Sequence, residues 1–319
     1  MDLYNIKGKS LEQIKRTPFK LEREIQSLIE SNVNELFDLE FVSTEFTVGD
    51  FRIDSLCYDK ENNCFVILEY KKGNSYSVVD QGYSYLSVML NNKAEFILEY
   101  NEAKNKQLKR DDVDWSQSRV VFISQSFNSY QKNSVNFKDI PFELWEIKRY
   151  SNNTISLVQH NSDSKESIKK VSGGKNKVIE SVSKQVKVLS EEDTLKDKKV
   201  SENTRELYYQ LKEQFLEWDD VNLNSKTHYI SFKRGKKAFV YLNFRKSYIR
   251  VHIGSYIKTK WDGSRESKEP TNKFILDDPK KMFEIWENDY KALYTYDIKN
   301  DKDLDYFLLM VKQKYQSVN

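Results

Sequence analysis

Two carboxylates and a lysine stand at the ends of two neighbouring β-rich segments. Asp54 follows Phe51-Arg52-Ile53, and after fourteen intervening residues Glu69-Tyr70-Lys71 follows the apolar run 65–68. Both acids therefore adjoin strongly apolar strands, where a fully solvated charge is not the default. Buried acids usually have a charged partner or a metal ion. The spacing predicts that these side chains share one site.

These residue types suit a hard divalent cation. Mg²⁺ is usually held by one or two carboxylates together with waters and a substrate phosphate, so Asp54 and Glu69, with the carbonyl of Tyr70, are candidate ligands. Lys71 points to the same face of its strand as Glu69, because side chains alternate along a strand. Its ammonium would orient or deprotonate an attacking water and stabilise transition-state charge, while the metal lowers the pKa of that water. Phosphodiester hydrolysis needs these parts.

An ordinary explanation stands beside this one. A chain rich in Lys and Glu produces such spacings by chance, and the residues would then be charged strand ends in water.

A predicted helix over 19–37 carries a further acid. At about 100° per residue, Glu22 falls within the apolar stripe near Ile25 and Ile29, whereas Glu24 falls outside it. We expect Glu22 to face the core or the site and Glu24 to face water. A second predicted helix, over 77–90, places Gln81 and Tyr85 one turn apart.

Taken in order, these positions resemble the motif of PD-(D/E)XK nucleases, particularly the RecB-like branch: Glu22, Asp54, Glu69-Tyr70-Lys71 and Gln81-x-x-x-Tyr85. The whole chain also resembles an uncharacterised bacterial and archaeal family, once labelled "predicted transport protein", which joins such a domain to a C-terminal domain of unknown function. That label has no support in the sequence, which lacks a membrane segment.

The resemblance implies that Asp54 and the Glu69–Lys71 signature bind Mg²⁺ or Mn²⁺ and that Glu22 assists. It also allows a homodimer, because many nucleases of this type act as dimers. One departure is visible: Ile53 stands where the family name has proline, a position that is commonly replaced.

The predicted elements indicate two domains. Residues 1–160 read as an α/β sandwich, and the resemblance implies a PD-(D/E)XK restriction-endonuclease-like fold with a mixed central sheet and flanking helices. Residues 161–202 have low apolar density and are predicted to be a charged linker that can contain a short helix or strand. Residues 203–319 are predicted to form an α+β domain with an antiparallel sheet.

Further elements are expected within these domains. Strands are predicted over 46–59, 64–70, 95–100, 119–124 and 142–150, with a short helix near 130. In the second domain, helices are predicted over 203–218, 279–293 and 301–315, and strands over 227–234, 237–245 and 247–255.

Positive charge is concentrated in the second domain. Residues 226–273 contain thirteen Lys or Arg and three acids, a net charge of +10, whereas the whole chain has +3. Strand alternation places Val240 and Ile249 on one face and Phe239 and Tyr241 on the other. Such an aromatic and basic face would stack bases and neutralise phosphates. The candidate nucleic-acid-binding residues are Lys233, Arg234, Lys236, Lys237, Tyr241, Tyr248, Arg250 and Trp261.

Several classes of protein are disfavoured. No run of 18 uncharged apolar residues exists and the N-terminus lacks the apolar core of a signal peptide, so we expect a cytoplasmic protein without membrane contact. Cys57 and Cys64 have no metal-ligand spacing and are predicted to be reduced core thiols.

The sequence thus predicts a divalent-metal-dependent DNA nuclease serving repair or defence against foreign DNA, with the strandedness of the DNA left open. The alternatives are a catalytically inactive nucleic-acid-binding module on the same fold and a protein-interaction scaffold.

Overall fold

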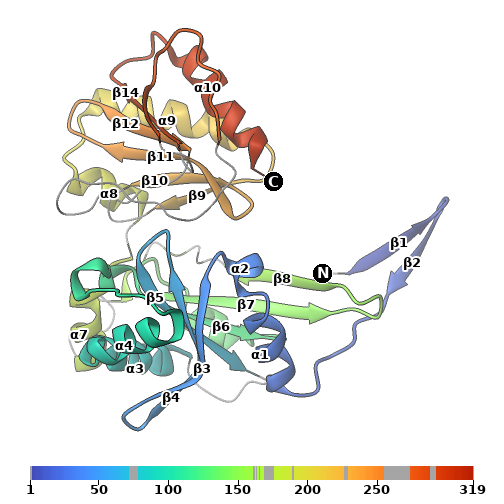
Figure 1. Cartoon of the computed structure of the whole chain (residues 1–319). Helices are drawn as coiled ribbons and strands as arrows, with labels where there is room; N and C mark the ends of the chain where they lie inside the picture. Colours follow the sequence, from blue (N-terminus) through green and yellow to red (C-terminus); the bar gives the residue numbers. More distant parts are fainter. Residues whose placement is uncertain are drawn as a thin grey trace. The chain divides into compact units, whose positions relative to one another are not determined.

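The chain divides into two compact units, Met1–Val188 and Leu189–Asn319 (Figure 1). The computed structural model describes residues 2–71, 78–160, 162, 164, 166–168, 176–188, 190–225, 229–254, 274–287 and 292–318. Within these ranges, no helix has both the length and the apolar character needed to cross a membrane.

Unit 1 is built around a six-stranded mixed sheet of order β3-β4-β5-β6-β7-β8. Strands β5, β6 and β7 are parallel to one another, and the other neighbouring pairs are antiparallel. The strand bounds are β3 Glu40–Val48, β4 Phe51–Asp59, β5 Cys64–Lys71, β6 Arg119–Ser124, β7 Phe142–Arg149 and β8 Ile155–His160. This mixed sheet with flanking helices confirms the predicted fold class.

Helices cover both faces of this sheet (Figure 1). Helices α1 (Glu22–Glu30) and α2 (Val33–Phe37) pack with Val66 and Leu68 of β5 on one face. The other face carries α3 (Val78–Asn91), α4 (Lys93–Lys104) and α7 (Lys177–Gln185), which share a core with Phe65 and Ile67. Strand β5 is therefore buried on both sides, as its unbroken apolar run predicts. Cys57 and Cys64 are buried thiols, as expected.

Three predicted secondary-structure elements of unit 1 differ from those in the structure. The predicted helix over 19–37 is two helices, α1 and α2, which break at Ser31–Asn32. The predicted strand over 46–59 contains a hairpin turn, where Gly49 has a φ of 56°. The predicted strand over 95–100 lies in helix α4, because Phe96 and Tyr100 are buried one helical turn apart while Leu98 is exposed.

Other elements of unit 1 were not predicted. They are the N-terminal hairpin of β1 (Leu3–Lys7) and β2 (Ser10–Ile14), strand β8, and the 3₁₀ turns Arg110–Asp112 and Trp115–Gln117. The short helix predicted near residue 130 is confirmed as α5 (Ser129–Ser134).

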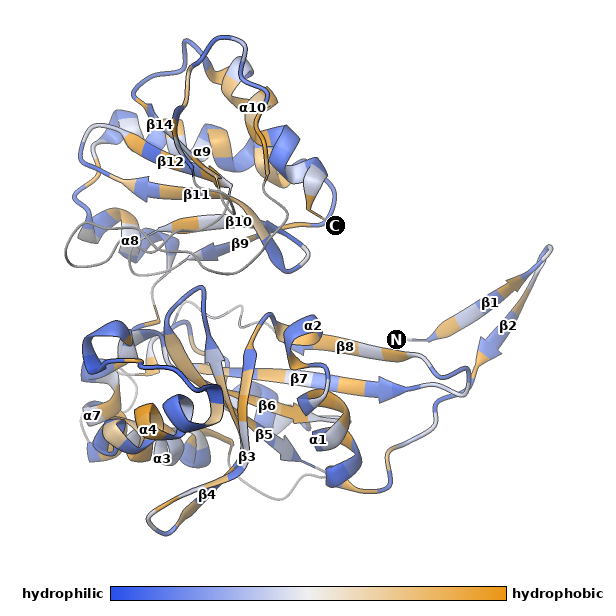
Figure 2. Cartoon of the chain, viewed as in Figure 1, coloured by the Kyte–Doolittle hydropathy of each residue, from blue (hydrophilic) through white to orange (hydrophobic). Residues whose placement is uncertain are grey.

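Unit 2 has a six-stranded sheet of order β13-β14-β12-β11-β10-β9, in which every neighbouring pair is antiparallel. Its strands are β9 Val221–Ser225, β10 Ile230–Arg234, β11 Lys237–Phe244, β12 Ile249–Gly254, β13 Glu284–Glu287 and β14 Ala292–Ile298. Helices α9 (Glu202–Leu216) and α10 (Leu304–Ser317) share its apolar core, and Figure 2 shows polar and apolar residues interleaved along both. The predicted C-terminal antiparallel sheet is confirmed.

The helix predicted over 279–293 is wrong. Residues there form strand β13 and the start of β14, which pair with each other and, through β14, with β12. The β12 and β14 strands are far apart in the sequence, and a local apolar pattern carries no information about such a ladder.

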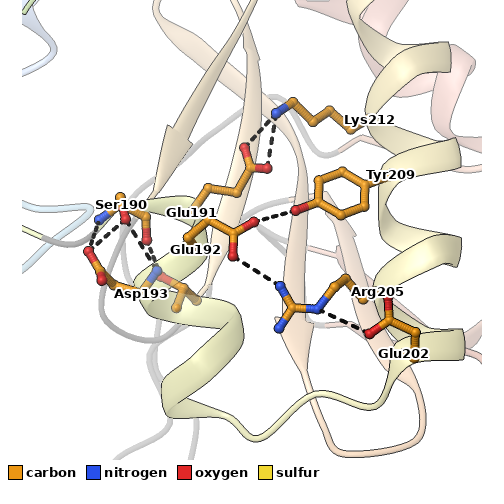
Figure 3. A network of polar contacts seen from close by, with 9 residues as sticks. Ser190, Glu191, Glu192, Asp193, Glu202, Arg205, Tyr209 and Lys212 are labelled. Atoms are coloured by element: carbon orange, nitrogen blue, oxygen red, sulfur yellow. Dashed lines mark hydrogen bonds and ion pairs between the residues drawn. The ribbon is translucent and has the colours of Figure 1, made fainter. Parts of the chain in front are cut away.

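The segment predicted as a linker, 161–202, contains helices of both units. Helix α7 belongs to unit 1, where Ile179 and Val182 join the core. Helix α8 (Glu191–Asp197) belongs to unit 2 and is tied to α9 by polar contacts (Figure 3). Glu191 pairs with Lys212 at 2.7 Å, and Glu192 pairs with Arg205 at 3.0 Å and accepts a hydrogen bond from Tyr209. Some of the charged residues in this segment therefore pair with residues of α9, and are not simply exposed to solvent.

Gly82 sets how closely α3 approaches the sheet. A Cβ atom built at this position would lie 2.5 Å from the ring of Phe142 on β7. Phe142 is itself packed edge-on against Tyr83 and Phe122, so its ring has little room to move.

We predict that Gly82→Ala lowers the free energy of unfolding of unit 1 by about 1 to 3 kcal/mol through overpacking. Helix propensity alone would give the opposite sign, a gain of about 1 kcal/mol. Chemical denaturation with Ser87→Ala on the same helix as control measures the difference. Stabilisation by Gly82→Ala would contradict the close packing.

Candidate metal centre

Strands β4 and β5 stop pairing at the point where the predicted site residues stand. Their ladder ends at Ser55 opposite Leu68. Beyond it, the backbone N–H of Tyr70 donates a hydrogen bond of 3.0 Å to Oδ2 of Asp54. A side-chain carboxylate thus takes a donor that a continued ladder would give to a backbone carbonyl. This contact joins Asp54 to the segment that carries Glu69 and Lys71.

Glu69 is the most enclosed acid of the site, with 4 % of its surface exposed. Its Oε1 accepts hydrogen bonds from Lys71 Nζ at 2.7 Å and from Gln81 Nε2 at 2.8 Å. Its Oε2 is buried and has no hydrogen-bond partner among the residues that the structure describes, and the same holds for Oε1 of Gln81. Unpaired buried oxygens cost free energy. Both oxygens are available to a cation or its waters.

The Gln81 and Tyr85 pair lies on α3 beside Glu69, so these predicted residues belong to the same neighbourhood. Gln81 Nε2 also lies 3.1 Å from the Tyr85 hydroxyl, which donates to the carbonyl of Arg52 at 3.4 Å. Burial, followed by the charge of Glu69, raises the pKa of Tyr85. The phenol therefore remains protonated and acts as a donor.

The electrostatics of Asp54 are those of a crowded acidic site. Burial, followed by the charge of Glu69, raises the pKa of Asp54 to about 7 from an ordinary value of 3.8, and the charge of Glu22 raises it further. The hydrogen bond from Tyr70 and the charge of Lys71 act in the opposite direction. Carboxylates that oppose each other's ionisation in this way are relieved by a bound cation.

Glu22 lies on the site side of its helix but not in the core. It is the first residue of α1 and its side chain is exposed, while its charge acts on Asp54. Glu24 was predicted to face water, and its side chain does so only in part. Glu24 is half-buried and lies 3.4 Å from Nη1 of Arg149, the last residue of β7. The Arg149 side chain thus contacts the part of α1 that the wheel assigned to solvent.

Two residues of α1 that the sequence reasoning missed support the site. Gln26 Nε2 donates to the backbone carbonyl of Asp54 at 3.1 Å and to Oε1 of Glu30 at 3.0 Å. The same Glu30 oxygen accepts from the hydroxyl of Ser55 at 2.6 Å, and Ser55 lies 3.0 Å from the hydroxyl of Tyr70. The four-residue spacing of Glu22, Gln26 and Glu30 was the available signal.

The donor set fits a hard cation with few protein ligands. Nowhere in the described ranges do three or more His, Cys, Asp or Glu side chains form a group that could hold a metal ion. The site offers two carboxylates, Asp54 and Glu69, which is a number that Mg²⁺ commonly uses. The carbonyl of Tyr70 stays a prediction as a third ligand, and the tyrosine side chain lies on the opposite face, in the core with α1.

Several predicted nucleic-acid-binding residues of unit 2 have partners within their own unit. Arg234 lies over the ring of Tyr315 at 4.7 Å and donates to the carbonyl of Val318 at 3.2 Å. Arg250 makes a two-pronged ion pair with Asp297, at 2.7 and 2.8 Å, and lies 5.8 Å from the Tyr248 ring.

The predicted open face of this sheet needs correction. Tyr241 is buried against Tyr229. Phe239 is fully buried in the same core as Val240, although strand alternation assigned Phe239 and Val240 to opposite faces. A bulge is the reason: Val240 pairs with Phe232 and Ala238 with Lys233, so Phe239 has no opposite residue. Lys236 and Lys237 are exposed and Lys233 is half-buried. Trp261 lies outside the described residues.

Comparison with known proteins identifies the family. Residues 191–282, all in unit 2, match the family model described as "Domain of unknown function (DUF5655)". A Haemophilus influenzae protein described as "Uncharacterized protein" is 44 % identical over 238 residues, which are 74 % of this chain and 78 % of that protein. The chain belongs to the same family as this Haemophilus influenzae protein. The shared part spans more residues than the matched domain model, so it extends beyond DUF5655.

Solved structures show more distant similarity. EndoMS in complex with double-stranded DNA has a TM-score of 0.27 and 17 % identity, covering 41 % of this chain and 47 % of its own. SfsA of Pyrococcus furiosus in complex with Ca²⁺ has a TM-score of 0.23 and 12 % identity, covering 42 % and 62 %. Each alignment spans less than two thirds of the solved chain.

The raised pKa of Asp54 has a consequence for stability. Between about pH 4 and pH 7 the folded protein holds a proton at Asp54 that the unfolded chain has lost, so the free energy of unfolding falls as the pH rises. We predict that Asp54→Asn raises this free energy at pH 8 by roughly 1 to 3 kcal/mol without divalent cations, and leaves it nearly unchanged at pH 4. Denaturation across this pH range measures it, with the exposed Asp50→Asn as control. Equal pH profiles for wild type and Asp54→Asn would contradict the assignment.

Proposed function

We propose that the chain is a divalent-metal-dependent DNA nuclease of the PD-(D/E)XK type, hydrolysing phosphodiester bonds in DNA repair or in defence against foreign DNA. One observation carries the proposal: Asp54, Glu69 and Lys71 converge where β4 and β5 part, with one buried oxygen of Glu69 unpaired among the described residues. The motif order across α1, β4, β5 and α3 gives independent support.

Asp54 and Glu69 would hold Mg²⁺ or Mn²⁺, with the carbonyl of Tyr70. When bound, the cation would polarise the scissile phosphate and lower the pKa of the attacking water. Lys71 would orient that water and stabilise negative charge in the transition state. Gln81 fixes Glu69 through the 2.8 Å hydrogen bond, and Gln26 fixes the backbone of Asp54 through the 3.1 Å hydrogen bond. Glu22, the exposed first residue of α1, would assist.

Unit 2 would bind or position the DNA. Its exposed Lys236 and Lys237 form part of the β10–β11 hairpin together with Lys233. Lysines grouped in this way neutralise phosphates without reading sequence.

The direct test is DNA cleavage. We predict that wild-type protein cleaves single- or double-stranded DNA with Mg²⁺ or Mn²⁺, and that Asp54→Ala, Glu69→Ala and Lys71→Ala each lower the rate at least about 100-fold, because each removes a group that acts on the transition state. Thermal unfolding of each variant verifies folding, and Asp50→Ala, purified identically, is the control. Unchanged cleavage in the Asp54 and Glu69 variants would contradict the proposal.

A second function is favoured by one contact. The 2.7 Å ion pair between Lys71 and Glu69 would also form in an inactive nucleic-acid-binding or protein-interaction module on the same fold, where the charges serve only each other. Such a module would bind without turnover.

Divalent cations separate the two functions. The nuclease is expected to lose cleavage in EDTA and regain it on addition of Mg²⁺ or Mn²⁺. DNA binding that weakens with salt, without cleavage under any of these conditions, would support the binding module. Weak, salt-insensitive association with DNA would point to the protein-interaction scaffold.

A further inference from the structure

A second polar cluster lies on the same face of the unit 1 sheet as the candidate metal centre, near the same end of its central strands. Lys71 is in register with Ser124 of β6, and Ser124 is in register with Glu146 of β7. Residues in register on parallel strands point to the same face, so Glu146 lies on the face of Lys71 and Glu69. Two strand spacings separate Glu146 from Lys71, about 10 Å.

Three basic side chains converge on Glu146. Its Oε1 lies 2.9 Å from Lys132 Nζ, 3.0 Å from His160 Nε2 and 3.2 Å from the backbone N–H of Phe127. Its Oε2 lies 3.2 Å from Lys148 Nζ. We call Glu146, Lys132, Lys148 and His160 the Glu146 cluster. Its residues come from α5, β7 and β8, which the fold brings to one end of the sheet.

The cluster has more positive than negative charge. Burial alone would raise the pKa of Glu146, but the contacts with Lys132, the Phe127 amide and Lys148, together with the nearby His160, outweigh it and hold the pKa at about 2. Glu146 is therefore ionised at neutral pH, and two lysines face this one carboxylate. Within the described residues, Glu146 is the acid with which both lysines pair. A net positive charge remains.

Both lysines can reach a further ligand. Their side chains are 37 % and 23 % exposed for Lys132 and Lys148, whereas that of Glu146 is 11 % exposed. An ammonium has three N–H donors, and the contact with Glu146 uses one of them. The carboxylate thus holds the two ammonium groups near each other and leaves donors directed away from itself. This is a suitable arrangement for an anion with several oxygens, such as a phosphate.

We propose that the Glu146 cluster binds a backbone phosphate of the nucleic acid near the scissile one, so that the substrate strand crosses the ends of β5, β6 and β7. The proposal rests on the nuclease function proposed above. Lys132 and Lys148 contact the phosphate, and Glu146 is a positioning residue that keeps them together. Phosphate contacts of this kind fix the register of the substrate and carry no sequence preference.

The test is DNA affinity as a function of salt. Labelled DNA is titrated with full-length protein in EDTA, which prevents cleavage. Lys132→Ala and Lys148→Ala are each expected to weaken binding several-fold and to reduce the slope of log affinity against log salt by about one. Lys184→Ala, which removes an exposed lysine paired with Glu180 on α7, is the matched control and is expected to change neither.

Removing both lysines would leave the Glu146 carboxylate without a cationic partner and could destabilise the fold. Two further variants therefore separate an effect on DNA binding from an effect on folding. Glu146→Gln keeps both lysines but removes the carboxylate that holds them near each other, and we expect it to weaken DNA binding less than Lys132→Ala or Lys148→Ala does. The triple variant Lys132→Gln, Glu146→Gln, Lys148→Gln leaves no unpaired charge in the cluster, and we expect it to keep the thermal unfolding midpoint of Glu146→Gln while losing affinity.

The outcomes distinguish the two proposals. If wild type binds and cleaves DNA and the lysine and triple variants match it in affinity and salt slope, the phosphate site is overturned and the nuclease stands. If wild type neither binds nor cleaves DNA, both are overturned. Loss of affinity in the lysine and triple variants, with the control unchanged, supports the phosphate site.

Discussion

The site depends on one buried carboxylate at the end of a buried strand. Glu69 follows four fully buried apolar residues of β5 and carries a charge into a region where an isolated charge is unstable. Lys71 and Gln81 satisfy one of its oxygens and leave the other without a partner in the described structure. Asp54, held by the amide of Tyr70, adds a second carboxylate whose ionisation Glu69 opposes. A bound cation would offset the repulsion between Asp54 and Glu69 and would also coordinate the second oxygen of Glu69. The electrostatics of the site are in this way linked to the proposed chemistry.

The surrounding layers hold this arrangement in place from both faces of the sheet. On one face, Gln26 and Glu30 of α1 bond to the backbone of Asp54 and to the side chain of Ser55. On the other face, α3 lies close to the sheet because Gly82 has no side chain, and this closeness brings Gln81 within reach of Glu69. A site built on packed strands and helices is more precise than one built on loops. The Glu146 cluster adds further polar side chains, from β7 and β8, on the same face of the sheet.

Patterns local to one element predicted the centre of unit 1 well. The apolar run of β5 predicted a strand buried on both faces, and the i, i+4 spacing on α3 predicted the pairing of Gln81 with Tyr85 beside Glu69. Failures occurred where distant partners decide the outcome: β14 forms because it pairs with β12, and Phe239 enters the core because a bulge shifts its strand. Gln26 was missed because a glutamine on a helix has many ordinary roles, and its hydrogen bond to Asp54 depends on tertiary packing. The Glu146 cluster likewise joins three elements that no sequence spacing connects.

The proposed chemistry requires that Asp54 and Glu69 together form a divalent-cation site. Titration of the full-length protein with Mn²⁺, followed by electron paramagnetic resonance of the free ion, tests it without requiring any turnover. We predict one Mn²⁺ site in wild type, which is weakened at least about tenfold in both Asp54→Asn and Glu69→Gln and retained in Asp50→Asn. Its affinity is expected to rise as the pH passes about 7 and Asp54 ionises. Wild-type protein that binds no Mn²⁺, or variants that bind it as well as wild type, would contradict the account.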